Sequence, residues 1–322
     1  MGAIGPHRSN QPERQQAALG RLTIRGRHNQ RGFQMLIAPM DMIHSTESFT
    51  FRNLKLLFRS YGRGKKLPIL FFHATGFSAD SYEPLHRLLN DQGHPVFALN
   101  FMGHGGSDST HDFKNWAFFG DQVEAFAQHL GFSEAIAVGH SIGGASVLHA
   151  AARPGNPFKK IVLLDPTVFS PFSSWWVPLF PNPLAKAAET RRSTFQNLRV
   201  VERSFRMHPL FKSWNPESFK GYLKSAFTED ADGFRLQLDP LLEAKIFRSF
   251  HRGQWHIFKK VKQPTLLITA RASSVTPPSA VKRLIAQSNH SLWIEHPGSH
   301  CFPMEDPAGV TFEIERFTRP GY

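Results

Sequence analysis

Short apolar runs alternate with helix-patterned segments along most of this chain. The apolar runs in the first half are Leu67–Phe72, Pro95–Phe101, Ala135–Val138 and Lys160–Leu164. The segments between them, with helical spacing of apolar residues, are Ser81–Gln92, Asn115–Leu130 and Ser141–Ala152. Continuous apolar runs suit strands that are buried on both faces of a parallel sheet. Strands alternating with helices predict the α/β class, with a doubly wound, mostly parallel sheet.

The alternation stops near Pro166 and resumes after Lys260. Residues 166–260 lack strand-like apolar runs, and their spacing predicts helices over Ala185–Met207 and Pro216–Phe227. A helical segment inserted between two strands, at the edge where ligands bind, is typical of a cap. The expected layout is a leader over residues 1–45, a core over 46–165 and 261–322, and a helical cap over 166–260.

The remaining core segments fit the same plan. Two short alternating runs within Ser48–Tyr61 indicate a pair of strands before the first buried strand. After the cap, the pattern predicts strands and helices in turn, over Thr265–Thr269, Ser279–Gln287, Ser291–Glu295 and Ala308–Phe317.

The net charge of +13 is concentrated in part at the beginning of the chain, where residues 1–34 carry six arginines against Glu13 alone. That segment has too few apolar residues to fold, so it indicates an unstructured leader or an over-extended start, with Met35, Met40 and Met42 close behind it, rather than a nucleic-acid-binding domain. Attraction to anionic surfaces is the functional alternative, and weak peripheral membrane contact is the corresponding partner. The chain has no apolar run of about 18 residues and no secretory signal pattern, and a single cysteine, so a cytoplasmic location is expected.

The motif Gly139-His140-Ser141-Ile142-Gly143 matches G-x-S-x-G and lies between a predicted strand and a predicted helix. A serine on such a sharp turn stands above the carboxyl edge of the sheet, and the neighbouring glycines leave room for the bend. Ser141 is therefore the predicted nucleophile. His300 follows the last predicted strand, within Gly298-Ser299-His300, and a histidine there can reach the same edge and serve as general base.

Together these motifs resemble the α/β-hydrolase superfamily over roughly residues 48–320. The segments that carry the resemblance are HATGF (73–77), NFMGHGGSD (100–108), GHSIGG (139–144), LLDP (163–166) and GSHCFPMEDP (298–307). The resemblance implies that residues 73–77 form the loop that contributes one oxyanion donor. The Thr75 and Ile142 amides are the expected donors, and preorganised amides of this kind contribute several kcal/mol to the rate.

The sequence departs from the family where the acid of the triad is expected. The loop after Thr265–Thr269 reads ARASSVTP and contains no carboxylate. Asp165, at the end of the strand next to the one carrying Ser141, is the favoured substitute. There are three alternatives: the acid is Glu295 or a cap residue such as Glu243, Asp165 serves only to form a turn, or the site has no acid at all.

These predictions combine into a serine hydrolase that cleaves a small carboxylic ester with an apolar acyl or alcohol part. The candidate substrate contacts are Phe77, His140, Phe169, Trp175 and Trp176. Neither a cofactor nor a metal site is expected, because the sequence shows no metal-ligand spacing and no phosphate-binding loop. Hydrolysis of an amide, thioester, lactone or carbon–carbon bond remains open, as does a relative that binds a ligand without catalysis.

Overall fold

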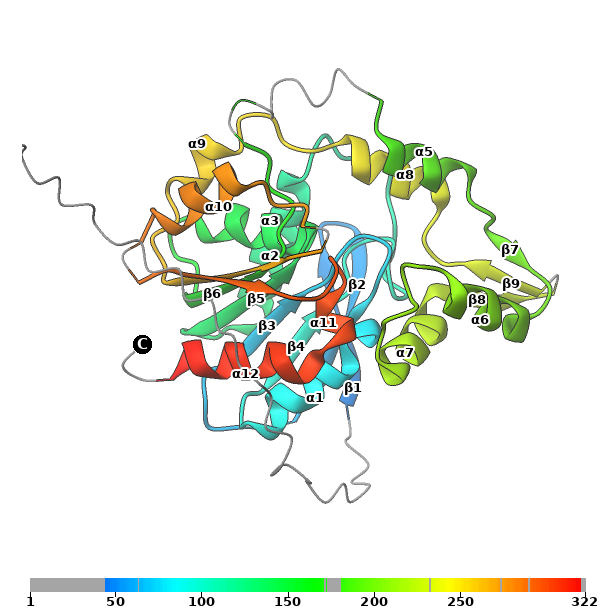
Figure 1. The fold of residues 1–322 in the computed structure, drawn as a ribbon, viewed down its shortest axis with the longest axis horizontal. Helices are drawn as coiled ribbons and strands as arrows, with labels where there is room; N and C mark the ends of the chain where they lie inside the picture. The colour runs from blue at the N-terminus through cyan, green and yellow to red at the C-terminus, as the bar shows by residue number, and fades with distance from the viewer. Residues whose placement is uncertain are drawn as a thin grey trace, which may run out of the picture. The chain divides into compact units, whose positions relative to one another are not determined.

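The computed structural model describes residues 44–319, except 63, 171, 173–180, 232, 273 and 289. Its main sheet has eight strands in the order β1-β2-β4-β3-β5-β6-β10-β11 (Figure 1). The first two strands form an antiparallel hairpin, and β2 also pairs antiparallel with β4. The other strands of this sheet, β3, β5, β6, β10 and β11, run parallel to β4. The strands are β1 (His44–Phe51), β2 (Leu54–Tyr61), β3 (Ile69–Phe72), β4 (Val96–Leu99), β5 (Ala135–His140), β6 (Phe158–Leu164), β10 (Thr265–Ala270) and β11 (Leu292–His296). The predicted doubly wound α/β sheet is confirmed.

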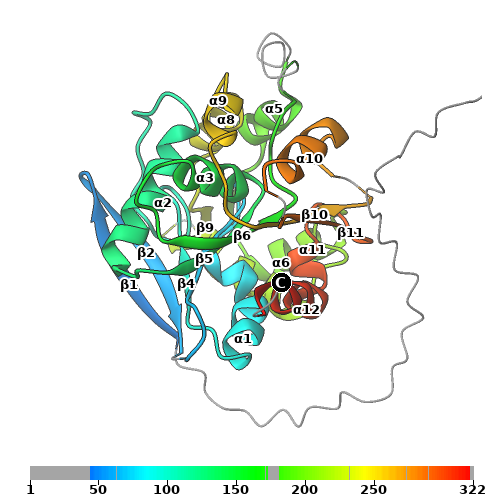
Figure 2. The ribbon, with the colours of Figure 1, turned by 90° about the vertical axis from the view of Figure 1, so that its left-hand side faces the viewer.

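Helices cover both faces of this sheet (Figure 2). One face carries α2 (Ala117–Leu130), α3 (Ile142–Ala151), α9 (Trp255–Phe258) and α10 (Pro278–Ile285). The other carries the short 3-10 helix η1 (Ala79–Tyr82), α1 (Glu83–Asp91), α11 (Phe302–Glu305) and α12 (Pro307–Thr318).

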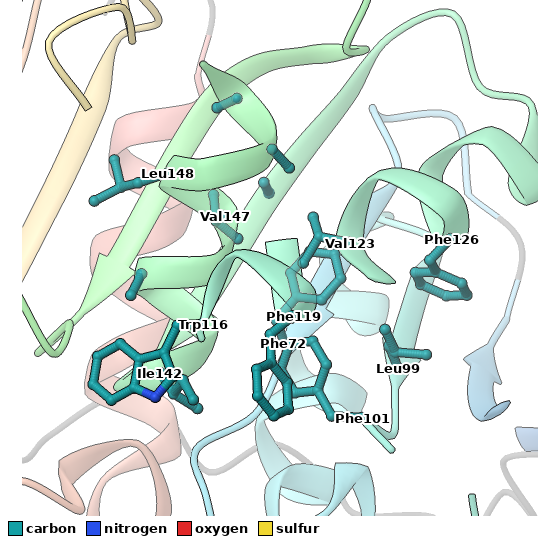
Figure 3. Packing of buried hydrophobic residues seen from close by; sticks show 14 of the residues in the cluster. Phe72, Leu99, Phe101, Trp116, Phe119, Val123, Phe126, Ile142, Val147 and Leu148 are labelled. Carbon is teal, nitrogen blue, oxygen red and sulfur yellow. The ribbon is translucent and has the colours of Figure 1, made fainter. Parts of the chain in front are cut away.

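Strand β3 shows how the apolar runs fill both layers. Leu70 and Phe72 belong to the core on the α2 and α3 side, whereas Ile69 and Phe71 belong to the core on the α1 and α12 side. This follows from the alternation of side chains along a strand. Figure 3 shows the first of these cores, where Ile142 of α3 lies among the buried aromatic side chains. Burying each large apolar side chain stabilises the fold by about 1.5–3 kcal/mol, so both ends of the bend at Ser141 are firmly anchored.

The insertion leaves the sheet after β6 and returns at β10, and these two strands are neighbours. Its elements are α5 (Pro183–Thr190), β7 (Thr194–Phe195), α6 (Leu198–Met207), α7 (Pro216–Ala226), β8 (Phe227–Asp230), β9 (Gly233–Leu236), α8 (Pro240–Arg248) and the short α9. The described part of the insertion is therefore not purely helical, because β7, β9 and β8 form a small antiparallel sheet. The prediction of a segment without strands was wrong. These strands are only two to four residues long, and Phe227 and Leu236 are their buried residues, which leaves too little alternation to detect.

The single helix predicted over Ala185–Met207 is two helices separated by β7. The Asn182 side chain accepts a hydrogen bond from the Ala185 amide at the start of α5, and the Asn197 side chain accepts one from the Arg199 amide at the start of α6. Asn197 is therefore the N-cap of a new helix, within a segment that the spacing of apolar residues alone predicts to be a single helix. Among the described residues, no helix is both long and apolar enough to cross a membrane.

Candidate active site

Ser141 occupies a strained bend between β5 and α3. Its backbone angles are φ 56° and ψ −118°, a region that non-glycine residues rarely adopt. The bend is held by its own backbone, because the Ser141 amide donates to the Leu164 carbonyl at 3.0 Å and its carbonyl accepts from the Gly144 and Thr167 amides. The Ser141 hydroxyl lies 3.0 Å from the Thr167 hydroxyl. The side chain therefore stands at the carboxyl edge of the sheet, partly exposed.

Two glycines make this bend sterically possible. A Cβ atom on Gly143 would lie 2.2 Å from the Phe72 carbonyl oxygen, and one on Gly139 would lie 2.5 Å from the Gly143 carbonyl oxygen. Both obstacles are backbone atoms, which cannot move aside as a flexible side chain does. The helix can therefore approach β3 this closely only because position 143 lacks a side chain.

His300 lies on the loop after β11 and reaches Asp165 at the end of β6. The distance from His300 Nδ1 to Asp165 Oδ2 is 2.6 Å, and the Asp165 side chain is fully buried. A carboxylate only accepts hydrogen bonds, so this contact places a proton on Nδ1 and leaves Nε2 as the basic nitrogen. The same ring lies beside that of His140, the residue before the serine, with ring centroids 4.8 Å apart.

The loop that lacks an acid supplies hydrogen-bond donors to Asp165 instead. Ser274 Oγ donates to Asp165 Oδ1 at 2.5 Å, and the Val275 amide donates to Oδ2 at 3.1 Å. The Thr276 hydroxyl and the Ala270 amide lie at 3.5 and 3.4 Å from Oδ1. These donors stabilise a buried carboxylate that would otherwise lack solvation.

The two other candidate acids lie elsewhere. Glu243 of α8 pairs with Arg191, with 2.8 Å between Oε2 and Nη2, and it lies against Gly76 rather than beside the histidine. Glu295 is exposed on β11.

In the loop after β3, the backbone amides on either side of Thr75 donate hydrogen bonds, whereas the Thr75 amide does not. The Ala74 amide donates to the Tyr82 hydroxyl, the Gly76 amide to His104 Nε2, and the Phe77 amide to the Ala74 carbonyl. Within the described part of the chain, the Thr75 amide makes no hydrogen bond, and neither does that of Ile142 at the start of α3. Both expected oxyanion donors therefore retain their hydrogen-bonding capacity.

A directed chain of hydrogen bonds joins this loop to the histidine segment. The Tyr82 hydroxyl accepts from the Ala74 amide at 3.1 Å and donates to His140 Nδ1 at 2.6 Å. His140 Nε2 in turn donates to the His300 carbonyl oxygen at 2.9 Å. Tyr82 and His140 are both fully buried, and the sequence pattern gave no signal for Tyr82 beyond its helical position.

Burial keeps His73, His104 and His140 neutral. Desolvation lowers the pKa of His73 and of His140 well below the ordinary value. Burial, helped by the positive charge of Arg191, lowers the pKa of His104 to about 4. Neutral rings can each accept on one nitrogen and donate on the other, which is how His73 and His104 brace the loops after β3 and β4.

The predicted substrate contacts are not all at one place. Phe77 lines a narrow cleft with Gly76 and His104, whereas Phe169 packs against the Trp116 and Phe250 rings. His140, also predicted as a substrate contact, is fully buried behind the serine with both ring nitrogens bonded, so it presents no edge to a ligand. Trp175 and Trp176 lie outside the described residues. Among the residues that are described, no three His, Cys, Asp or Glu side chains gather as metal ligands would.

A parallel sheet with a serine on the bend between its central strand and a helix is the architecture of α/β enzymes that act at the carboxyl edge of the strands. Residues 68–307 match the family described as the alpha/beta hydrolase fold, which is well over half of the chain. The protein therefore belongs to the alpha/beta hydrolase family, as its motifs predicted.

Known proteins similar to this chain agree at the level of the fold. The bifunctional esterase/perhydrolase DCH of Acinetobacter calcoaceticus is 34% identical over 100 residues, and that match spans 30% of this chain and 36% of the enzyme's length. The uncharacterized hydrolase YugF of Bacillus subtilis is 24% identical over 300 residues, which cover 87% of this chain and all of that protein. The crystal structure of E-2-(acetamidomethylene)succinate hydrolase superposes with a TM-score of 0.73 at 18% identity, covering 85% of this chain and 99% of that one.

Proposed function

We propose that this protein is a serine hydrolase that cleaves a carboxylic ester with an apolar acyl or alcohol part through an acyl-enzyme. The observation that carries the proposal is the 2.6 Å contact between His300 and the buried Asp165 carboxylate, at the same edge of the sheet as the strained bend that holds Ser141. Together these give a hydroxyl nucleophile, an imidazole of fixed tautomer and a carboxylate that balances the imidazolium.

In the proposed reaction, the Ser141 oxygen attacks the ester carbonyl carbon while His300 Nε2 takes the hydroxyl proton. The tetrahedral intermediate collapses when the carbon–oxygen bond to the alcohol breaks, and His300 returns the proton to the departing alkoxide. Water then attacks the acyl-enzyme with His300 again as base, releasing the acid and restoring the serine. Throughout, Asp165 stabilises the positive charge on the ring.

The oxyanion of each intermediate would be bound by the Thr75 and Ile142 amides. Both lack partners in the described chain, so no existing hydrogen bond has to break before they bind a developing negative charge. Removal of one donor from such a pair typically lowers turnover by about 10²–10³-fold, so these amides are a major part of the proposed rate enhancement.

The ester assignment is supported by the apolar ring of Phe77 in the cleft and by the similarity to the esterase/perhydrolase. An amide is the second candidate bond, because 2-(acetamidomethylene)succinate hydrolase of Mesorhizobium japonicum is 22% identical over 219 residues, or 67% of this chain. The same serine, base and oxyanion donors would serve either bond.

A fluorophosphonate probe tests the nucleophile directly. We expect labelling of the full-length protein and its complete loss in Ser141→Ala, with retained labelling in Ser146→Ala, a buried serine on the same helix. A panel of p-nitrophenyl and p-nitroanilide derivatives with increasing acyl length then separates esters from amides. A folded protein that neither reacts with the probe nor cleaves any member of the panel would overturn the proposal in favour of a ligand-binding protein.

A further inference from the structure

A cavity of about 320 Å³ lies within the insertion. Its walls are largely apolar, formed by Phe195, Phe205, Tyr222 and Leu236, and two guanidinium groups, those of Arg191 and Arg192, border it. This volume is at the lower end of the range for small-molecule sites, about 300–1,000 Å³. Apolar walls with a cationic border suit a small amphipathic anion.

This cavity adjoins the cleft beside the proposed oxyanion loop. The cleft is lined by Gly76, Phe77 and His104 from the core, and it shares Arg191, Tyr222 and Leu236 with the cavity. Gly76 directly follows Thr75 in the chain. The cleft itself has a free volume of only about 20 Å³, room for about one water molecule. A molecule in the cavity would therefore have to widen the cleft beside Arg191 to reach the residues proposed to bind the reacting carbonyl.

Arg191 has hydrogen-bonding capacity to spare. Its Nη2 contacts Glu243 at 2.8 Å, but its Nε–H is buried and has no partner in the described chain. A guanidinium carries five N–H donors in a fixed plane, and a buried donor without an acceptor is costly. A carboxylate can accept from two of these donors at once, which would satisfy the unpaired edge.

The neighbouring arginine differs. Arg192 is exposed, its Nε already donates to the Thr194 carbonyl at 2.7 Å, and its guanidinium lies 5.0 Å from the centre of the Phe195 ring. Arg192 thus contributes to the wall, and Arg191 has the donors available for a ligand.

Charge in the insertion favours the same kind of ligand. Over residues 181–260, Lys and Arg outnumber Asp and Glu by nearly two to one. A field of this sign raises the local concentration of anions. Glu243 is the opposing charge nearest to Arg191, and burial raises the pKa of its carboxyl.

We propose that Arg191 is a specificity-determining residue that binds a carboxylate on the substrate, at the far end of an apolar body that fills the cavity. This inference rests on the proposed function and names its substrate class: monoesters of small dicarboxylic acids and similar anionic esters. Glu243 is the ion-pair partner of Arg191 and, by its charge, limits affinity for such anions.

Two chromogenic substrates of equal length test this directly. Mono-4-nitrophenyl adipate carries a free carboxylate, and 4-nitrophenyl methyl adipate carries the methyl ester in its place. The measured quantity is kcat/KM for the anionic ester divided by kcat/KM for the neutral one. We expect Arg191→Gln to lower this ratio by about tenfold or more, mainly through KM, and Arg191→Lys to restore part of it. Glu243→Gln should raise the ratio.

Arg199→Gln is the matched control, because Arg199 is exposed on α6 and lines neither cavity nor cleft, yet its loss changes the net charge equally. Its ratio should stay within twofold of the parent. An unchanged ratio in both Arg191→Gln and Glu243→Gln would overturn the inference while leaving the proposed function intact. If Arg191→Gln does not fold, Glu243→Gln alone decides through the sign of its effect.

Calorimetry separates this inference from the catalytic proposal. Ser141→Ala should bind 4-phenylbutyrate more tightly than 4-phenylbutyramide, and the additional Arg191→Gln change should abolish that preference. If the parent protein has no esterase activity and the preference for the acid still depends on Arg191, the anion site is supported and the proposed function is rejected. Equal binding of acid and amide would reject the anion site.

Discussion

Asp165 and His300, 135 positions apart in the chain, meet through a 2.6 Å contact at the carboxyl edge of the sheet. The carboxylate comes from the end of β6 rather than from the loop after β10, where the family usually carries it. That loop turns toward the same carboxylate, and Ser274 and Val275 donate hydrogen bonds to it. In the proposed triad, the acid has thus moved by one strand while its contact with the histidine is kept.

Replacement of this carboxylate should remove most of the activity. We expect Asp165→Asn to lower kcat on a p-nitrophenyl ester by about 10³–10⁴-fold with little change in KM, because the amide cannot balance an imidazolium and favours the wrong tautomer. Steady-state kinetics with circular dichroism as a check on folding provides the measurement. Glu295→Gln is the control, since Glu295 is exposed on β11, which is separated from β6 by β10. Full activity in Asp165→Asn would reduce Asp165 to a turn residue.

The Tyr82 hydroxyl should matter more than its distance from the chemistry suggests. Tyr82→Phe leaves the Ala74 amide and His140 Nδ1 without partners, and each unpaired buried group costs about 1–3 kcal/mol. Because these groups brace the oxyanion loop and the His300 carbonyl, we expect kcat to fall by about 10–100-fold while KM changes little.

Tyr61 offers a matched comparison for that experiment. It is also a buried tyrosine on the α1 side of the sheet, and its hydroxyl has no hydrogen-bond partner among the described residues. Tyr61→Phe should therefore retain its kcat and its melting temperature. Equal losses of kcat in both variants would mean that Tyr82 contributes only to packing.

The alternation of strands and helices was readable from the sequence because each core strand is a continuous apolar run. The strand predicted over Ala135–Val138, for example, is the buried first part of β5, which extends to His140. The small sheet of the insertion has no such pattern, because β8 and β9 are only four residues long and each has a single fully buried residue. The local pattern of apolar residues identifies long buried strands and helices, but it misses short ones that are stabilised by tertiary contacts.

Only the site residues that a local motif or a position after a strand marks could be predicted from the sequence. Ser141 carries its own motif, and His300 follows from its position after the last strand. The partnership of Asp165 with the loop at Ser274 depends on strands that meet in space, and so does the pairing of Tyr82 with His140. Thr167 likewise carries no motif, so its contact with the Ser141 hydroxyl is visible only in three dimensions.

The glycine at position 143 should tolerate no side chain. In Gly143→Ala the added Cβ would lie 2.2 Å from the Phe72 carbonyl oxygen, so the start of α3 or strand β3 must shift. We expect a loss of about 1–3 kcal/mol in the free energy of unfolding, measured by urea denaturation. Gly155→Ala is the comparison for backbone strain, because its Cβ would meet open space while its φ of +76° strains any side chain. Gly143 does not lie at a positive φ, so Gly143→Ala measures crowding without that strain. A Gly143→Ala protein as stable as the parent would contradict the close approach.

Three buried histidines should make the fold sensitive to acid. Burial lowers the pKa of His86 and of His149 to about 3 and that of His104 to about 4, whereas each titrates near 6.5 when the chain is unfolded. Below about pH 6.5 the unfolded chain therefore binds protons that the folded protein excludes, and stability must fall as the pH falls toward 4. Each histidine contributes a slope of up to about 1.4 kcal/mol per pH unit in this window.

Urea denaturation at pH 7, 6 and 5 measures this pH dependence of the free energy of unfolding. His149→Gln should lower the slope by the contribution of one histidine. His290→Gln, which removes an exposed histidine, should leave the slope as it is. A free energy of unfolding that stays constant between pH 7 and 5 would mean that these rings accept protons in the folded state.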